Sequence, residues 1–149
     1  MPVIPVVHGT DASVAWKISR TGFSALSSLD AGFYGVGMYF TSSALYALPY
    51  YAPKNHPAIL LCLTVPGNPL PVVENRNESG GFYGKPLRSG YQSHLSSPRK
   101  ADPIQIIRDS KVFNEIVIAH ESQVVPFAIV DLDGEKLDSL AAEFERKIP

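Results

Sequence analysis

The segment 58–65 is the strongest constraint that the sequence places on its fold. Every residue in it except Thr64 is apolar. A continuous apolar run of this length predicts a strand that is central in its sheet and buried on both faces. Cys62 lies inside this run and is the only cysteine of the chain, so we interpret it as a core residue.

The other strand-like segments do not alternate with helical ones. Runs rich in β-branched and apolar residues predict strands at 3–7, 38–40, 104–107, 114–119 and 124–132. The first contains a proline, which is typical of an edge strand. Because strands follow one another late in the chain, parallel βαβ winding is disfavoured. The sequence predicts an α+β fold with mostly antiparallel sheets.

Two helices have clear signals in the sequence. Thr10 or Asp11 can cap a helix over 12–21, and Gly22 stops it. Near the end of the chain, the apolar residues of 134–148 have the spacing of an amphipathic helix. Both helices are expected to bury one face.

Proline and glycine limit two further segments. Thr41 and Ser42 can cap another helix, which Pro49 is expected to disturb near its end. The segment 66–102 is rich in Gly, Pro, Ser and Asn and has little periodicity. It predicts a long irregular loop, and such loops are often binding loops.

Length and charge bound the functional classes. The 149 residues, of which 45% are hydrophobic, fit one domain over 1–149. The formal net charge of -1 gives no strong field toward nucleic acid or an acidic membrane. The N-terminus lacks the pattern of a signal peptide, and no apolar stretch is long enough for a membrane span. We therefore expect an intracellular protein with no membrane partner.

The tripeptide His8-Gly9-Thr10 is the first candidate for chemistry. Glycine lets a ligand approach the backbone, whose N–H and C=O can both reach an amide. The side chains of His8 and Thr10 offer groups for sugar hydroxyls. The alternative is an ordinary turn from strand to helix with a capping threonine.

The second candidate is the glycine-rich segment 35–41, which is followed by Tyr46, Tyr50 and Tyr51. Tyr39 lies within it. Aromatic rings beside such a loop can sandwich a flat heterocycle and favour a cationic one. The glycine spacing does not match a dinucleotide-binding fingerprint. The alternative is that these rings pack in the core.

Glu115 is the third candidate, because it interrupts a strongly apolar strand together with Asn114. A carboxylate in such surroundings needs partners. It can hold sugar hydroxyls and stabilise an oxocarbenium-like transition state. The alternative is a strand edge on which Glu115 faces water.

Taken together, the three motifs resemble the catalytic domain of poly(ADP-ribose) polymerase-like ADP-ribosyltransferases, the diphtheria-toxin type with an H-Y-E triad. The order His-Gly-Thr, Gly-x-Gly-Met-Tyr-Phe and Asn-Glu-Ile-Val-Ile matches, and the resemblance covers 6–130. It implies two small, mostly antiparallel sheets packed as a split β-sandwich with a few flanking helices. It also implies NAD⁺ as a co-substrate and no metal.

The resemblance assigns roles to residues of the first two motifs. His8 would bind the adenosine ribose 2′-hydroxyl, and Thr10 the same ribose. Gly9 would hold the nicotinamide carboxamide through its backbone. Tyr39 would lie on one side of the nicotinamide, and Tyr50 matches the second stacking tyrosine by spacing.

The catalytic role falls on Glu115, which would hold the nicotinamide-ribose 2′-hydroxyl and stabilise positive charge as the glycosidic bond breaks. Ala47 stands where the family often has a serine for the carboxamide. Ser43 substitutes for that serine if one helical turn is deleted, and Tyr46 then becomes the stacking ring.

The resemblance implies transfer of ADP-ribose to a protein or nucleic-acid acceptor. It favours mono-ADP-ribosylation, because the position beside the expected serine, which is often lysine in chain-elongating members, is Tyr46. We expect a monomer. A loop over 80–99 is expected on the acceptor side. Its basic residues, with the one that follows, would suit a phosphate-bearing acceptor: Lys85, Arg88, Arg99 and Lys100. The alternatives are a solvated loop, a catalytically silent NAD⁺ or ADP-ribose binding module, and an RNA 2′-phosphotransferase-like enzyme.

Overall fold

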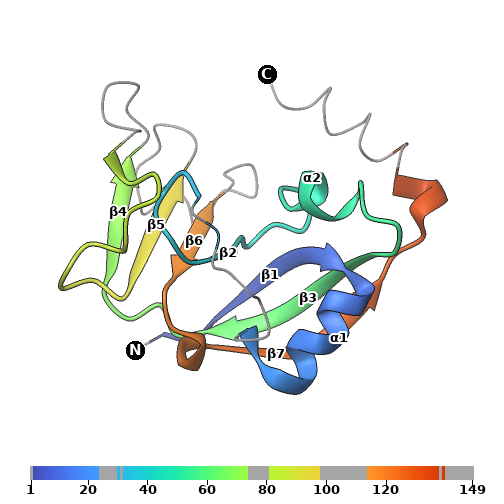
Figure 1. The fold of residues 1–149 in the computed structure, drawn as a ribbon, viewed down its shortest axis with the longest axis horizontal. Helices are drawn as coiled ribbons and strands as arrows, with labels where there is room; N and C mark the ends of the chain where they lie inside the picture. The colour runs from blue at the N-terminus through green and yellow to red at the C-terminus, as the bar shows by residue number, and fades with distance from the viewer. Residues whose placement is uncertain are drawn as a thin grey trace.

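The computed structural model describes residues 2–23, 30, 32–73, 81–97, 114–137 and 139, and its strands form two sheets (Figure 1). The first sheet has the order β1-β3-β7 and consists of β1 (Ile4–Asp11), β3 (Pro57–Thr64) and β7 (Val124–Asp131). The second has the order β2-β6-β5-β4 and consists of β2 (Met38–Phe40), β4 (Pro69–Val73), β5 (Ser93–Ser97) and β6 (Glu115–Ile118). Only the β4–β5 pair is parallel among the paired strands described. The expected α+β class with two small, mostly antiparallel sheets is confirmed.

The predicted central strand is β3, which pairs with β1 on one side and with β7 on the other. Its side chains alternate between two cores, because Leu60 belongs to one cluster and Ile59 to the other. Cys62 is fully buried, as expected. The exception is Leu63, which is 38% exposed. Burial on both faces is therefore confirmed for most of the strand.

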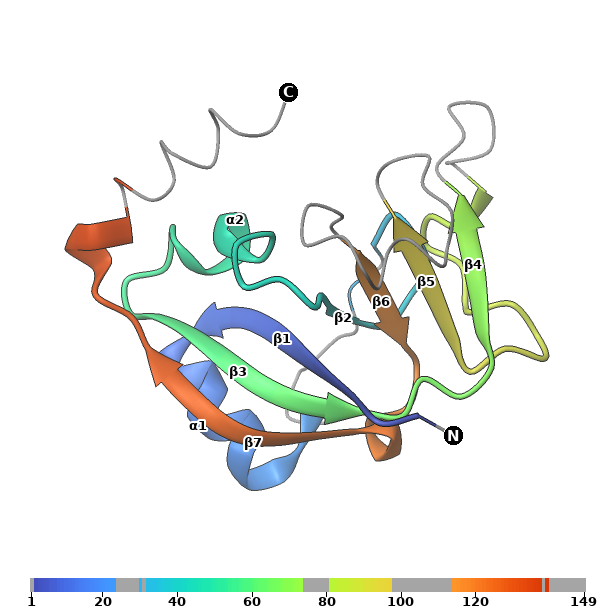
Figure 2. The ribbon, with the colours of Figure 1, turned by 180° about the vertical axis from the view of Figure 1, so that it is seen from behind.

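Two hydrophobic clusters cover the two faces of the first sheet. The larger joins α1 (Ala12–Thr21) to strands of both sheets; among its buried members are Val6, Ile18, Phe23, Phe40, Leu60 and Ile116. The smaller packs α2 (Leu48–Tyr51) and Leu137 against Val7 and Ile59. Both views place α1 and α2 on opposite sides of the β1-β3-β7 sheet (Figure 2). Apolar burial on both faces thus fixes the position of β1, which carries His8.

Helix α1 has the predicted bounds. Its N-cap is Asp11, and not Thr10, because the Asp11 side chain accepts a hydrogen bond from the Ser13 N–H at 2.9 Å. Gly22 ends the helix with a φ of 76°, and its N–H donates to the Ile18 carbonyl. Before α1, β1 lies at the edge of its sheet as expected, but it continues through His8-Gly9-Thr10. The interpretation of this tripeptide as a turn is wrong.

The helix predicted after Thr41 and Ser42 begins later in the chain than expected. The helix does not follow Ser42 but is the short α2, and Pro49 lies in its first turn. Proline has a fixed φ and no N–H to donate, so it suits the first turn, where that N–H has no intrahelical acceptor. Pro49 therefore fits the first turn of the helix that it was expected to disturb.

The segment 66–102 is only partly irregular, because it contains β4 and β5. The strand β4 was not predicted because it contains Pro69 and Pro71, and proline has no N–H to donate to a neighbouring strand. β4 lies at the edge of its sheet, where strand prolines are tolerated. The excursion therefore adds two strands to the sheet that carries Tyr39 and Glu115.

The remaining predictions differ in how far the structure describes them. The strands predicted at 38–40, 114–119 and 124–132 are present as β2, β6 and β7 within one residue at each end. The strand predicted at 104–107 lies outside the described residues. Of the helix predicted at 134–148, residues 134–137 and 139 are described and are helical. No helix within the described ranges is long and apolar enough to cross a membrane.

Candidate functional site

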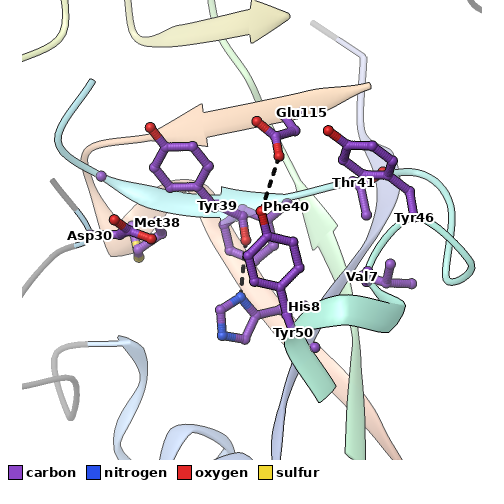
Figure 3. Close-up of a pocket in the computed structure, with 13 residues that line it drawn as sticks. Val7, His8, Asp30, Met38, Tyr39, Phe40, Thr41, Tyr46, Tyr50 and Glu115 are labelled. Carbon is purple, nitrogen blue, oxygen red and sulfur yellow. Dashed lines mark hydrogen bonds between the residues drawn. The ribbon is translucent and has the colours of Figure 1, made fainter. Parts of the chain in front are cut away.

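A cavity of about 350 Å³ lies where β1, β2, the start of β6 and α2 meet (Figure 3). Seven residues from the sequence-based site prediction line it: His8, Gly9, Tyr39, Tyr46, Ala47, Tyr50 and Glu115. The structure therefore brings together three motifs that are far apart in the chain.

Thr10 and Ser43 do not line this cavity. Thr10 is buried in β1 opposite Ala58. The Ser43 hydroxyl accepts a hydrogen bond from the Tyr46 N–H at 3.3 Å, and its carbonyl accepts one from the Ala47 N–H at 3.2 Å. Ser43 therefore holds the turn before α2, and Ala47 is the residue of that pair on the cavity wall.

His8 is held by the backbone of β2. Its Nδ1 lies 3.0 Å from the Tyr39 carbonyl oxygen, which can only accept, so Nδ1 carries the proton. Burial lowers the pKa of His8 below 6.5, although the bond to Tyr39 opposes this shift. The ring of Phe23 meets the imidazole edge to face at 5.5 Å. Neutral His8 thus keeps Nε2 as a hydrogen-bond acceptor.

Gly9 contributes its main chain to the cavity. Val7 exchanges two hydrogen bonds with Thr41, at 2.8 and 3.2 Å, on the edge of β1 that faces away from β3. Because main-chain groups of a strand alternate between its edges, the N–H and C=O of Gly9 point to that same edge. A Cβ at Gly9 would lie 2.9 Å from Tyr51 and 3.1 Å from the Ala47 carbonyl. Only glycine lets α2 approach β1 this closely.

The Tyr39 ring is held by two hydrogen bonds of its hydroxyl. Its hydroxyl donates to the Gly35 carbonyl at 2.7 Å and accepts from the Tyr34 N–H at 3.0 Å. Burial raises the pKa of this phenol, and the carboxylates Asp30 and Glu115 add to the shift. The hydroxyl therefore stays protonated, and the ring forms a rigid wall of the cavity.

Glu115 is 8% exposed, so the alternative in which it faces water is wrong. The Tyr50 hydroxyl donates to its Oε1 at 3.5 Å, and Figure 3 shows this contact spanning from α2 to β6. Burial raises the pKa values of Tyr46 and Tyr50, and Glu115 raises both further through its charge and hydrogen bonding. A buried carboxylate thus faces two protonated tyrosines.

Asn114 fixes the start of β6 against the segment after β2. Its Oδ1 accepts from the Ser42 N–H at 3.0 Å, and its Nδ2 donates to the Ser42 hydroxyl at 2.7 Å. Asn114 is itself buried. This pair of bonds determines where the next residue, Glu115, enters the cavity.

Asp30 lines the cavity and was missed by the sequence-based prediction. Its Oδ1 accepts from the Gly32 N–H at 2.7 Å, and its carbonyl accepts from the Gly37 N–H at 3.0 Å. The signal in the sequence was an Asp-x-Gly turn, which says nothing about a cavity. Among the residues described, the cavity wall has two carboxylates and neither lysine nor arginine. The described part of the chain also has no group of three or more His, Cys, Asp or Glu side chains placed to hold a metal ion.

The basic loop lies apart from this cavity where it is described. Lys85 and Arg88 are exposed and do not line the cavity, while Arg99 and Lys100 lie outside the described residues. His94 lies within the segment predicted as this loop, in β5, and is fully buried between the Tyr34 carbonyl and the Arg88 N–H, at 2.7 and 3.0 Å. Comparison of the chain with protein-family models and with curated proteins gives no match.

Proposed function

We propose that this protein is an NAD⁺-dependent mono-ADP-ribosyltransferase of the H-Y-E type. The observation that carries the proposal is the position of Glu115. Its buried carboxylate shares one cavity with His8, Gly9 and Tyr39, the residues that the family motifs select. The two small, mostly antiparallel sheets agree with the fold expected for this family.

Glu115 would act on the nicotinamide ribose. As the bond between C1″ and the nicotinamide nitrogen breaks, positive charge moves from the ring to the ribose. A carboxylate that is buried and held in place stabilises this charge more in the transition state than in the ground state. The Tyr50 hydroxyl donates a long hydrogen bond, of 3.5 Å, to Oε1. No general acid is needed, because nicotinamide leaves as a neutral molecule.

Gly9 and the tyrosines would hold the nicotinamide. The N–H and C=O of Gly9 point away from β3, in the arrangement that a carboxamide requires. Aromatic rings and two carboxylates favour the cationic nicotinamide of NAD⁺. Both Tyr46 and Tyr50 line the cavity, so Tyr46 joins the site beside the tyrosine selected by spacing. His8 Nε2 would accept a hydrogen bond from the adenosine ribose.

The test is release of nicotinamide from NAD⁺ and transfer of labelled ADP-ribose to acceptors, with wild-type protein and Glu115→Gln. We expect the variant to lower turnover by about a hundredfold or more, because it removes the charge that stabilises the transition state. We expect NAD⁺ binding, measured by calorimetry, to change far less. The control is Asp131→Asn, which also replaces a carboxylate by an amide. Asp131 is an exposed residue of β7 and does not line the cavity.

Three outcomes would contradict the proposal. Full activity of Glu115→Gln would remove the role assigned to this carboxylate. Tight binding of NAD⁺ by the wild-type protein without any release of nicotinamide would identify a silent binding module. If the protein releases no nicotinamide from NAD⁺ by itself but removes a 2′-phosphate from RNA, the phosphotransferase-like alternative is favoured.

A further inference from the structure

A second cavity of about 270 Å³ adjoins the first one. The two share a wall of Asp30, Tyr39, Tyr46, Tyr50 and Glu115. The second cavity adds Gly32, Phe33 and Tyr34. Phe33 and Tyr50 are 44% and 54% exposed, so this space opens to solvent at its aromatic rim. A group that enters here from another molecule reaches Glu115 from outside the first cavity.

The walls of this second cavity favour a cation. It has two carboxylates, Asp30 and Glu115, and no lysine or arginine among the described residues that line it. An incoming phosphate or carboxylate would meet like charges at short range. A guanidinium or ammonium group would gain from both carboxylates and from the faces of the surrounding aromatic rings.

Asp30 is prepared to bind such a group. Its Oδ1 is already engaged by the Gly32 N–H, and its main chain is bonded to Gly37. These two contacts fix the carboxylate before a ligand arrives, so little entropy is lost on binding. The carboxylate also acts across the cavity, because its charge raises the pKa values of Tyr39 and Tyr50 after the larger effect of burial.

We propose that the second cavity is the acceptor site and that it takes a positively charged nitrogen side chain of a protein, a guanidinium or an ammonium group. This inference rests on the proposed function. It selects a protein over a nucleic acid as acceptor, and it assigns Asp30 as the residue that holds the acceptor.

The acceptor nitrogen first gives one proton to the Asp30 carboxylate, which passes it to solvent, because a protonated nitrogen has no lone pair to share. This nitrogen then forms a bond to C1″ of the ribose, while the bond from C1″ to the nicotinamide nitrogen breaks and its electron pair neutralises the ring. The products are the N-linked ADP-ribosyl side chain, nicotinamide and a proton.

The first experiment uses the wild-type protein with NAD⁺ and four peptides of one sequence. They carry arginine, citrulline, lysine or glutamate at a single position, and an oligonucleotide with a terminal phosphate is a fifth acceptor. Citrulline has the shape of arginine without its charge. We expect label on the arginine or lysine peptide, with mass spectrometry showing which, and none on the other three acceptors.

The second experiment compares Asp30→Asn with Asp131→Asn. Asparagine keeps the Oδ1 acceptor for Gly32 and removes only the charge. We expect Asp30→Asn to lower transfer to the cationic peptide by about tenfold or more relative to release of nicotinamide to water, since a hydrogen bond to a charged group is lost. Asp131→Asn should keep the wild-type ratio.

The outcomes separate the two proposals. If the wild-type protein releases no nicotinamide under any condition, the proposed function fails. If it releases nicotinamide and labels glutamate, citrulline or the oligonucleotide, the proposed function stands and the inference about the acceptor is overturned. An unchanged ratio in Asp30→Asn would also overturn the role of Asp30.

Discussion

His8 has its two ring nitrogens in different roles. Nδ1 is occupied by the Tyr39 carbonyl, so Nε2 accepts hydrogen bonds only while the ring is neutral. Burial lowers the pKa of His8 below 6.5. We therefore expect NAD⁺ affinity to be constant from alkaline pH down to 6.5 and to fall only as the pH passes through the lowered pKa. Calorimetric titration across this range checks it, and a loss of affinity centred above 6.5 would contradict it.

The same lowered pKa affects stability. The folded protein binds this proton less readily than the unfolded chain, so the contribution of His8 to stability is complete above pH 6.5 and is lost as the pH falls through the lowered pKa. His8→Gln lacks this titration. We expect the difference in unfolding free energy between wild type and variant to shrink on acidification, as measured by urea unfolding. A difference that grows toward acidic pH would show that burial is not the dominant effect on the pKa of His8.

At the level of single residues, the motifs in the sequence predicted seven of the residues that line the cavity. His8, Tyr39 and Glu115 were found because each has an unusual polar or glycine-rich setting in an apolar segment. Asp30 has no such setting, since Asp-x-Gly is an ordinary turn pattern. Its place on the wall depends on the approach of Gly37 to its carbonyl, a contact that spacing along the chain does not reveal.

Strand β6 depends on a polar clamp to deliver Glu115. Replacing Asn114 by alanine removes both hydrogen bonds to Ser42, which we expect to cost ~1–3 kcal/mol of stability, because each such bond contributes ~0.5–1.5 kcal/mol. Transfer activity should fall as well, because Glu115 follows directly. Ser42→Ala removes only the hydroxyl partner and should have the smaller effect on both. Thermal unfolding and nicotinamide release measure the two quantities, and equal effects of the two variants would contradict the clamp.

Helix α2 carries Tyr50 and rests against β1 at Gly9. Gly9→Ala would push its Cβ against Tyr51 and the Ala47 carbonyl, so we expect a loss of ~1–3 kcal/mol and weaker NAD⁺ binding as α2 moves outward. Gly81→Ala is the matched control, because no heavy atom lies within 4 Å of the added Cβ. Chemical denaturation and calorimetry compare the variants. Normal binding by a destabilised Gly9→Ala protein would show that α2 does not need this contact.

Elements were predictable where the chain itself determines them. β3 followed from a continuous apolar run, and α1 from Asp11 and Gly22 at its ends. The start of α2 was misplaced and β4 was missed, because proline in the first turn of a helix or at a sheet edge is tolerated, whereas inside either element it is disruptive. Tertiary position decides between these two cases, and the local sequence does not contain it.

For the molecule as a whole, the reactivity of the Cys62 thiol is expected to report global unfolding. It lies in central β3, and burial raises the pKa of its thiol to about 12. We expect thiol reagents to label it only when the sheet opens, with a rate that follows the unfolding equilibrium in increasing denaturant. Mass spectrometry of pulse-labelled protein measures this rate. Rapid labelling of the native protein would show that β3 opens locally.

The edge of β1 beyond Val7 has a consequence for how this site can be studied. The groups that Gly9 offers belong to the main chain, so every substitution other than proline leaves them in the molecule. Replacement of Gly9 by alanine tests the space beside these groups and does not remove the groups themselves. A change of the backbone, such as an ester in place of the Gly9 amide, removes the donor while every side chain stays the same. Such a variant would separate the hydrogen bond of Gly9 from the packing of α2 against it.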